Sequence, residues 1–237
     1  MSEQHMDGTV AVDASCGKAG FLVLLRHGQT FWSESGQHTG RTNISLTEVG
    51  RQQAMDAGAR LREAFPEGFD PECVFSSPLK RACQTAELAG FAQHGILDGI
   101  AEWDYGRAEG RTRQQVSEAS GFSWDVWRDG PRSLTPTLEG DWVDTLPDGE
   151  QVNVHSGAGE TLDEVAARAR TAIEEVTPLL QSGRNVLLVA HAHILRILTS
   201  QWLNVDPQFA RLLRLDTAHY SVLSVYKGDN VIERWNA

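Results

Sequence analysis

Two histidines in this chain follow apolar segments, in positions where side chains can meet a ligand. The apolar run 21–25 leads directly into Arg26 and His27, and the run 186–190 leads into His191. Both runs predict buried strands, and ligands of open α/β sheets bind outside the carboxyl ends of parallel strands. One histidine in such a place is more often structural, but two parallel strands of one sheet would bring His27 and His191 to the same edge. We therefore expect an active site there.

A second arginine lies at the start of a predicted helix. Residues 73–75 form a third short apolar run, and Ser77 and Pro78 after it are typical of a helix N-cap and a first helical position. Gly90 suits the far end of this helix. Arg81 then lies in the first turn, where free backbone N–H groups and the positive end of the helix dipole favour an anion.

Together these segments resemble the histidine phosphatase superfamily, also known as the phosphoglycerate mutase-like family, branch 1, over most of residues 20–237. In that family the histidine of an R-H-G sequence is phosphorylated, and that position here is His27. The resemblance implies that the phosphate pocket is completed by Arg26, Arg81 and His191. It also implies a catalytic acid ahead of a Y-G-x-x-E-G stretch, where Glu102 stands.

These residue types suit the transfer of a phosphoryl group. A phosphomonoester carries negative charge on three oxygens, and the planar donor forks of Arg26 and Arg81 match those oxygens. His27 must attack through a neutral ring nitrogen, so its second nitrogen needs a partner, for which a backbone carbonyl near Gly28 is a candidate. A protonated carboxyl, which we assign to Glu102, would supply a proton to the poor alkoxide leaving group.

This interpretation requires no metal and no cofactor, because arginines and histidines neutralise the phosphate charge. The alternative is a zinc site, since His191 and His193 place two imidazoles on one face of an extended segment. Neither a cysteine cluster nor an H-E-x-x-H helix accompanies that pair. We therefore expect His193 to form hydrogen bonds at the start of a helix that reaches Leu203.

Composition favours one globular enzyme domain. The 237 residues are 41% hydrophobic, and 32 acidic residues against 21 lysines and arginines give a net charge of −11. That charge argues against nucleic acid and anionic membranes as partners. Three cysteines without C-x-x-C spacing are expected to be reduced, which is typical of a cytoplasmic protein. Residues 1–19 lack a secretory signal pattern and are expected to be disordered, which leaves 20–237 as the enzyme domain.

The rest of the chain alternates predicted helices and strands. Helices are expected over 47–65 and over 161–181, the second opened by a capping-box pattern. Residues 221–226 and 231–235 alternate as the two strands of a C-terminal hairpin. We expect an α/β fold, a three-layer α/β/α sandwich with a mixed, mostly parallel central sheet.

Two less regular stretches are expected to bind the substrate. Residues 31–46 are polar and lie beside the nucleophile, and residues 129–160 hold three prolines and five glycines. Long irregular stretches in compact domains are usually functional or disordered, so we expect a lid or insertion at about 100–160. The candidate phosphate ligand here is Ser33, and the candidate substrate contacts are Thr39, Gly40, Tyr105 and Arg113. For Arg113, which falls where mutases of the family carry a basic residue, the alternative is a solvated helix charge.

The chain departs from those mutases at two places. Mutases usually carry Asn where Ser33 stands and an arginine pair near residues 127–130, and both help to hold a phosphoglycerate carboxylate. Residues 33–40 and 127–130 instead resemble acid and sugar-phosphate phosphatases, such as sedoheptulose bisphosphatase-like members. We therefore expect a phosphatase that acts on small phosphomonoesters, with sugar phosphates favoured, and releases inorganic phosphate. The alternatives are a cofactor-dependent phosphoglycerate mutase and a catalytically silent member that binds phosphorylated ligands, and the pattern leaves the oligomeric state open.

Overall fold

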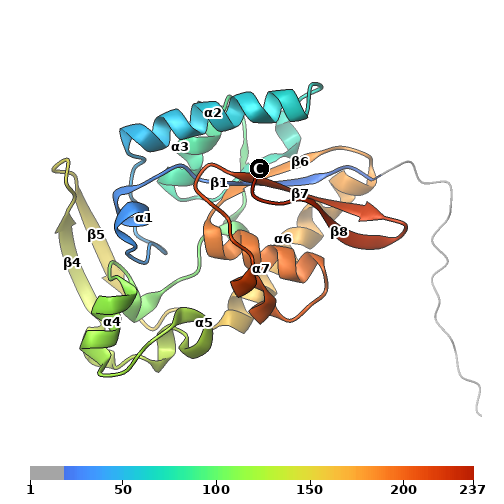
Figure 1. Cartoon of the computed structure of the whole chain (residues 1–237). Coiled ribbons are helices and arrows are strands. Elements are labelled where there is room, and N and C mark those ends of the chain that lie inside the picture. The colour runs from blue at the N-terminus through green and yellow to red at the C-terminus, as the bar shows by residue number, and fades with distance from the viewer. Residues whose placement is uncertain (1–18) are drawn as a thin grey trace, which may run out of the picture.

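The fold is built on one six-stranded sheet. A computed structural model describes residues 19–237, so nearly all of the segment expected to be disordered, 1–19, lies outside it. The strands are β1 (Leu22–Arg26), β2 (Val74–Ser76), β3 (Gly95–Ile96), β6 (Val186–Ala190), β7 (Tyr220–Tyr226) and β8 (Asp229–Arg234). Their order is β3-β2-β6-β1-β7-β8 (Figure 1). Strands β1, β2, β3 and β6 are parallel and β7 is antiparallel to its neighbours, which confirms the mixed, mostly parallel sheet.

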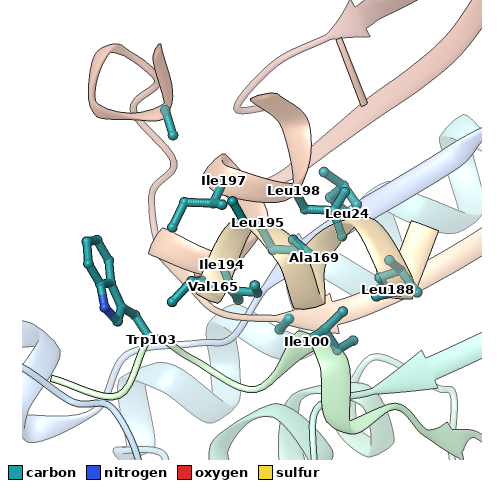
Figure 2. Packing of buried hydrophobic residues seen from close by; sticks show 14 of the residues in the cluster. Leu24, Ile100, Trp103, Val165, Ala169, Leu188, Ile194, Leu195, Ile197 and Leu198 are labelled. Carbon is teal, nitrogen blue, oxygen red and sulfur yellow. The ribbon is translucent and has the colours of Figure 1, made fainter. Parts of the chain in front are cut away.

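Alternating side chains of β1 fill two cores on opposite faces of the sheet. Leu22 and Leu24 belong to the core under α6 (Leu162–Gln181) and α7 (Ala192–Trp202). Val23 and Leu25 belong to the core under α2 (Glu48–Ala64) and α3 (Lys80–Leu88). Figure 2 shows Leu24 beside Leu198 of α7. Each such buried side chain stabilises the fold by roughly 1.5–3 kcal/mol. Because successive side chains of a strand point to opposite faces, β1 packs against a helical layer on each face of the sheet.

Local capping signals place the ends of two long helices. Thr47 Oγ1 accepts a hydrogen bond from Gly50 N at 3.0 Å at the start of α2. Thr161 and Glu164 form the expected capping box of α6, with 2.8 Å between Thr161 N and Glu164 Oε2. None of the helices in the described part of the chain combines the length and the apolar character that a membrane span needs.

Helix α3 begins later than the sequence predicted. Its N-cap residue is Leu79, two residues beyond Ser77, and no side chain caps it. The hydroxyl of Ser77 instead accepts from Leu79 N at 3.3 Å and meets the ring of His191 at 2.7 Å. A tertiary partner therefore replaces the expected capping role, while Arg81 keeps its place in the first turn.

The stretch from 129 to 160 is more regular than expected. It contains an antiparallel hairpin of β4 (Gly140–Thr145) and β5 (Gln151–Ser156), and the helices α4 (Arg113–Ser120) and α5 (Val126–Asp129) precede it. A further short helix, α1 (Phe31–Ser35), lies in the polar segment after β1. Figure 1 shows the hairpin on the same side of the sheet as α1.

The hairpin packs against the segment that follows β1. Val152 and Val154 of β5 are buried in one cluster with Trp32 and Ile44. The alternation of buried and exposed residues along β5 was a readable strand signal, but the surrounding prolines, glycines and acids obscured it. The hairpin thus forms a cover over the 31–46 segment, and its closing as a lid stays a prediction.

Candidate active site

The ends of three parallel strands meet at one edge of the sheet. His27 N donates to Ala190 O at 2.9 Å, and Ser77 N donates to Val189 O at 2.9 Å. His191 follows β6 directly and serves as the N-cap residue of α7. The sheet register therefore brings His27, Ser77 and His191 together, as the apolar runs predicted for the two histidines.

His27 is held as a neutral imidazole with a defined tautomer. Its Nδ1 lies 2.7 Å from Gly28 O, and because a carbonyl only accepts, Nδ1 carries the proton. Among the described residues Nε2 has no hydrogen-bond partner. Burial lowers the pKa of His27 well below its ordinary value, and the charges of Arg81 and Arg26 lower it further. Nε2 is therefore an unprotonated nitrogen that can attack phosphorus.

His191 lies behind His27, with 5.1 Å between the two ring centroids. Its Nδ1 accepts from Arg81 Nε at 3.1 Å, so Nε2 carries the proton and donates to Ser77 Oγ at 2.7 Å. Burial lowers the pKa of His191 well below its ordinary value, and Arg81 adds to that effect. Both ring nitrogens of His191 thus have protein partners, and its side chain is fully buried.

Arg81 lies under the cavity rather than in its wall. Its Nη1 donates to Thr42 O at 3.0 Å, and its Nη2 donates to the carbonyl oxygens of Thr39 and Gly40, both at 2.9 Å. Burial lowers the pKa of Arg81 to about 10, which leaves the group charged at neutral pH. The guanidinium therefore supplies buried positive charge next to His191 and His27.

Glu102 connects the cavity to the start of α7. Its Oε1 accepts from Trp103 N and Ile194 N, both at 2.9 Å, and its Oε2 accepts from His193 N at 3.1 Å. A carboxylate has about four lone-pair sites, so Oε2 keeps one for a proton or a substrate oxygen. The helix N-terminus and the loop together fix the orientation of this carboxylate.

A cavity of about 200 Å³ opens at this edge of the sheet. It is lined by Arg26, His27, Trp32, Ser33, Gly36, Gln37, His38, Thr39, Glu102, Tyr105, Ala192 and His193. Six of these are residues that the sequence predicted, namely Arg26, His27, Ser33, Thr39, Glu102 and Tyr105. Arg26 donates from Nη1 to Leu215 O at 2.6 Å, while its Nε is buried without a protein partner. Arg26 also lines the cavity, and a guanidinium there suits an anionic oxygen of a ligand.

The structure does not bring four of the predicted residues to the cavity wall. Arg81 and His191 lie beneath it, as described above. Gly40 is packed so closely that a Cβ there would lie 2.5 Å from Trp103 O. Arg113 begins α4 outside the cavity, where it donates to Trp124 O at 2.9 Å and pairs with Asp125 at 3.3 Å. Arg113 therefore bonds to the residues between α4 and α5 and does not line this cavity.

Ser33 lines the cavity, but its hydroxyl is already committed. Its Oγ donates to Thr30 O at 2.9 Å and accepts from Thr30 N at 2.9 Å within the capping box of α1. Thr39 also lines the cavity, and its hydroxyl donates to Gln37 O at 3.2 Å. Both residues therefore line the wall near His27, while their hydroxyls form hydrogen bonds with backbone groups.

Two imidazoles of the wall, His38 and His193, were not among the predicted site residues, although His193 was expected to form hydrogen bonds at the start of a helix. The Nδ1 of His193 is hydrogen-bonded to the hydroxyl of Tyr105, and His38 Nδ1 lies 2.7 Å from Arg111 O. Burial lowers the pKa of both histidines, so both are neutral at physiological pH. The signal that could have found them was their position next to Thr39 and His191 in the motifs.

The zinc alternative does not fit the partners of its two histidines. His191 uses Nδ1 for Arg81 and Nε2 for Ser77, and His193 uses Nδ1 for Tyr105. The guanidinium beside His191 Nδ1 would also repel a cation. Within residues 19–237, moreover, no group of three His, Cys, Asp or Glu side chains is arranged to hold a metal ion.

Known proteins are similar to this chain in sequence over most of its length. Residues 22–237 match the histidine phosphatase superfamily (branch 1). An acid phosphatase of Mycobacterium tuberculosis is 35% identical over 207 residues, which are 87% of this chain and 87% of that protein. A 2,3-bisphosphoglycerate-dependent phosphoglycerate mutase of Corynebacterium kroppenstedtii is 30% identical over 223 residues, which are 90% of this chain and 89% of that protein.

The fold has a solved counterpart as well. The structure of the product of a Mycobacterium tuberculosis open reading frame superimposes with a TM-score of 0.74 at 31% identity, and the match covers 92% of this chain and 97% of that chain. The family match contains the R-H-G segment, the arginine of α3 and the histidine after β6. The chain therefore belongs to branch 1 of the histidine phosphatase superfamily.

Proposed function

We propose that this chain is a metal-independent phosphatase that hydrolyses small phosphomonoesters, with sugar phosphates as the favoured class. The observation that carries the proposal is the state of His27, whose Nδ1 is fixed by Gly28 O at 2.7 Å. That bond leaves a neutral Nε2 in a cavity shared with Arg26 and Glu102. The similar acid phosphatase supports hydrolysis as the outcome.

In the first step His27 Nε2 attacks phosphorus and the ester P–O bond breaks. The Arg26 guanidinium at the cavity wall stabilises the charge on an equatorial oxygen, and the buried charge of Arg81 adds long-range stabilisation. The leaving oxygen takes a proton from the Glu102 carboxyl, because an alkoxide is a poor leaving group. The products of this half-reaction are the alcohol and phosphohistidine.

In the second step water attacks phosphorus and the N–P bond breaks. Glu102 takes a proton from that water through Oε2, the oxygen that accepts only one backbone hydrogen bond. Inorganic phosphate leaves, His27 returns to its neutral form, and Glu102 is again protonated for the next cycle. One ester and one water thus give one alcohol and one phosphate.

The charge of the cavity wall favours hydrolysis of a neutral alcohol's ester. Arg26 is the one arginine or lysine among the residues that line the described cavity, and His38 and His193 are neutral. A single cationic side chain suits one phosphate attached to an uncharged, hydroxyl-bearing group. The carboxylate of a phosphoglycerate would call for a second cation.

Phosphoglycerate mutase is the second candidate, because a mutase is 30% identical over most of this chain. It would need the phosphohistidine to outlast the exchange of substrates, whereas hydrolysis needs water to reach it. An assay with 3-phosphoglycerate and 2,3-bisphosphoglycerate, reading the 2-phosphoglycerate formed, separates the two candidates.

The test measures phosphate release in EDTA from sugar phosphates, p-nitrophenyl phosphate and 3-phosphoglycerate. Wild type is compared with His27→Ala and with His94→Ala, a control in which another histidine that bonds a backbone carbonyl is removed away from the cavity. We expect release by wild type and the control and none by His27→Ala. Release by His27→Ala, or loss of wild-type activity in EDTA, would overturn the proposal, and no release from any ester would favour the mutase or a silent binder.

A further inference from the structure

A buried carboxylate outside the cavity holds the segment that surrounds Arg81. The Glu109 side chain is fully buried, and both of its oxygens lie 3.0 Å from Gly40 N. Its Oε1 also accepts from Thr42 N at 2.9 Å. Two backbone donors of the 39–42 segment thus converge on one acidic group.

The segment lies against Glu109 without room to move closer. A Cβ on Gly40 would lie 2.6 Å from Glu109 Oε2 and 2.5 Å from Trp103 O. Only glycine fits this approach of backbone to carboxylate. The position of the carboxylate therefore sets the position of the segment.

The same segment faces Arg81, and its Thr39–Gly40 peptide group contacts both side chains, because Gly40 N donates to Glu109 and Thr39 O accepts from Arg81 Nη2. The carbonyl oxygens of Thr39, Gly40 and Thr42 accept from its Nη1 and Nη2 at 2.9–3.0 Å. The remaining donor, Nε, lies 3.1 Å from His191 Nδ1. One peptide group therefore links Glu109 to Arg81, and Arg81 fixes the tautomer of His191.

Charge explains why this arrangement is a linked unit. An isolated buried carboxylate or guanidinium is costly, and each is tolerated when hydrogen bonds and an opposite charge compensate it. Burial raises the pKa of Glu109 to about 7 and lowers the pKa of Arg81 to about 10, and the charge of each group opposes the shift of the other. Removal of either group leaves the other without its partner.

We propose that Glu109 is a positioning residue of this active site, which holds residues 39–42 so that their carbonyls orient Arg81 against His191. The role rests on the proposed phosphatase function as far as activity is concerned. The structural part of the proposal, the effect of Glu109 on the tautomer of His191, does not depend on any reaction and can be measured directly.

The kinetic test combines Glu109→Gln with Arg81→Lys in a double-mutant cycle, with p-nitrophenyl phosphate as substrate. Glu109→Gln alone should lower kcat by about 10- to 100-fold with little change in KM, because a displaced guanidinium costs transition-state stabilisation. In the Arg81→Lys background the same change should cost less than about 3-fold, since the group that the segment orients is gone. Glu139→Gln, which alters an acid paired with Arg107 outside the cavity, serves as the control.

A second readout needs no activity. The ¹⁵N shifts of the His191 ring report its tautomer, and hydrogen exchange reports the Gly40 and Thr42 amides. In Glu109→Gln we expect a mixed His191 tautomer and faster exchange of both amides. If that variant does not fold, Glu109→Asp, which keeps the charge but shortens the side chain, should show the same changes.

Three results bear on the proposal in different ways. An unchanged His191 tautomer with unchanged amide exchange would overturn the positioning role whether or not wild type hydrolyses esters. If the effects of Glu109→Gln and Arg81→Lys on kcat multiply in the double variant, Glu109 does not act through Arg81 and that part of the proposal is wrong. A wild type without activity, combined with an altered tautomer in the variant, would reject the phosphatase function and leave the positioning role intact.

Discussion

His27 and His191 lie with their ring centroids 5.1 Å apart and carry their protons on different nitrogens. His27 is protonated on Nδ1 by its bond to Gly28 O, and His191 on Nε2 by its bonds to Arg81 and Ser77. The bond of His27 occupies the nitrogen that does not attack, and the bonds of His191 occupy both of its ring nitrogens. His27 therefore presents Nε2 as a nucleophile, and His191 keeps a neutral ring beside two guanidinium groups.

The bond between His191 and Ser77 predicts a kinetic role for a serine that has no direct part in the chemistry. Ser77→Ala removes the acceptor for a buried N–H, at a cost of about 1–3 kcal/mol. Without that acceptor, we expect the ring of His191 to turn or to change tautomer next to His27. We expect kcat for p-nitrophenyl phosphate to fall by about 10-fold.

Ser76→Ala is the matched control for that experiment. Ser76 is equally buried and one residue away, but its hydroxyl donates to Ser77 O instead of contacting an imidazole. Its kcat should stay within about 2-fold of wild type. Equal losses of kcat in the two variants would mean that the strand end, rather than the bond to His191, governs the rate.

Glu102→Gln should discriminate between leaving groups. An alkoxide needs a proton and p-nitrophenolate hardly does, so the variant should slow a sugar phosphate by about 100-fold or more and p-nitrophenyl phosphate by less than about 10-fold. A structural effect at the start of α7, where the carboxylate accepts from His193 N and Ile194 N, would slow both substrates alike. The ratio of the two kcat values is therefore the measurement, and a ratio unchanged from wild type would assign Glu102 to binding.

The sequence predicted those parts of the fold whose signals are local. The apolar runs that became β1 and β6, and the caps at Thr47 and Thr161, follow from residues next to one another in the chain. Strand β3 has two residues and no pattern of its own, because the pairing with β2 defines it. The β4–β5 hairpin was obscured by acids and prolines, although the buried alternation of β5 was present.

For the site, the motifs identified which residues lie close together but not their hydrogen-bond partners. The structure places Arg26, His27 and Glu102 at the cavity, as the linear motifs led us to expect. The environment of Arg81 depends on carbonyls that come from about 40 residues earlier in the chain, so no local pattern contained it. Arg113 was selected because mutases of the family carry a basic residue at its position, and its partners are Trp124 O and Asp125.

The raised pKa of Glu109 predicts how stability changes with pH. Burial raises this pKa from 4.5 to about 7, against the lowering effect of hydrogen bonds from the 39–42 segment and of Arg81. Folding thus favours the protonated form, so the stabilisation is complete below pH 4.5 and is lost as pH rises through 7. The free energy of unfolding of wild type should fall by on the order of 3 kcal/mol more than that of Glu109→Gln between pH 4 and pH 8.

Urea unfolding of the two proteins at each pH measures that difference, because other titrating groups contribute equally to both. The groups that face Glu109, namely Arg81 and Tyr105, remain in the variant. Parallel curves of unfolding free energy against pH would mean that Glu109 titrates near its ordinary value in the folded state.

The hairpin should influence substrate binding through one hydrogen bond. Trp32 lines the cavity, and its indole Nε1 donates to Asp144 Oδ2 of β4 at 3.1 Å. Asp144→Ala removes that acceptor and about 1 kcal/mol of orientation for the ring, so KM should rise by about 5-fold while kcat stays unchanged. Asp141→Ala on the same strand is the control, since its partner His155 is exposed and such a pair contributes little. An equal rise of KM in both variants would trace the effect to the strand as a whole, whereas a rise confined to Asp144→Ala would make the hairpin part of the binding wall.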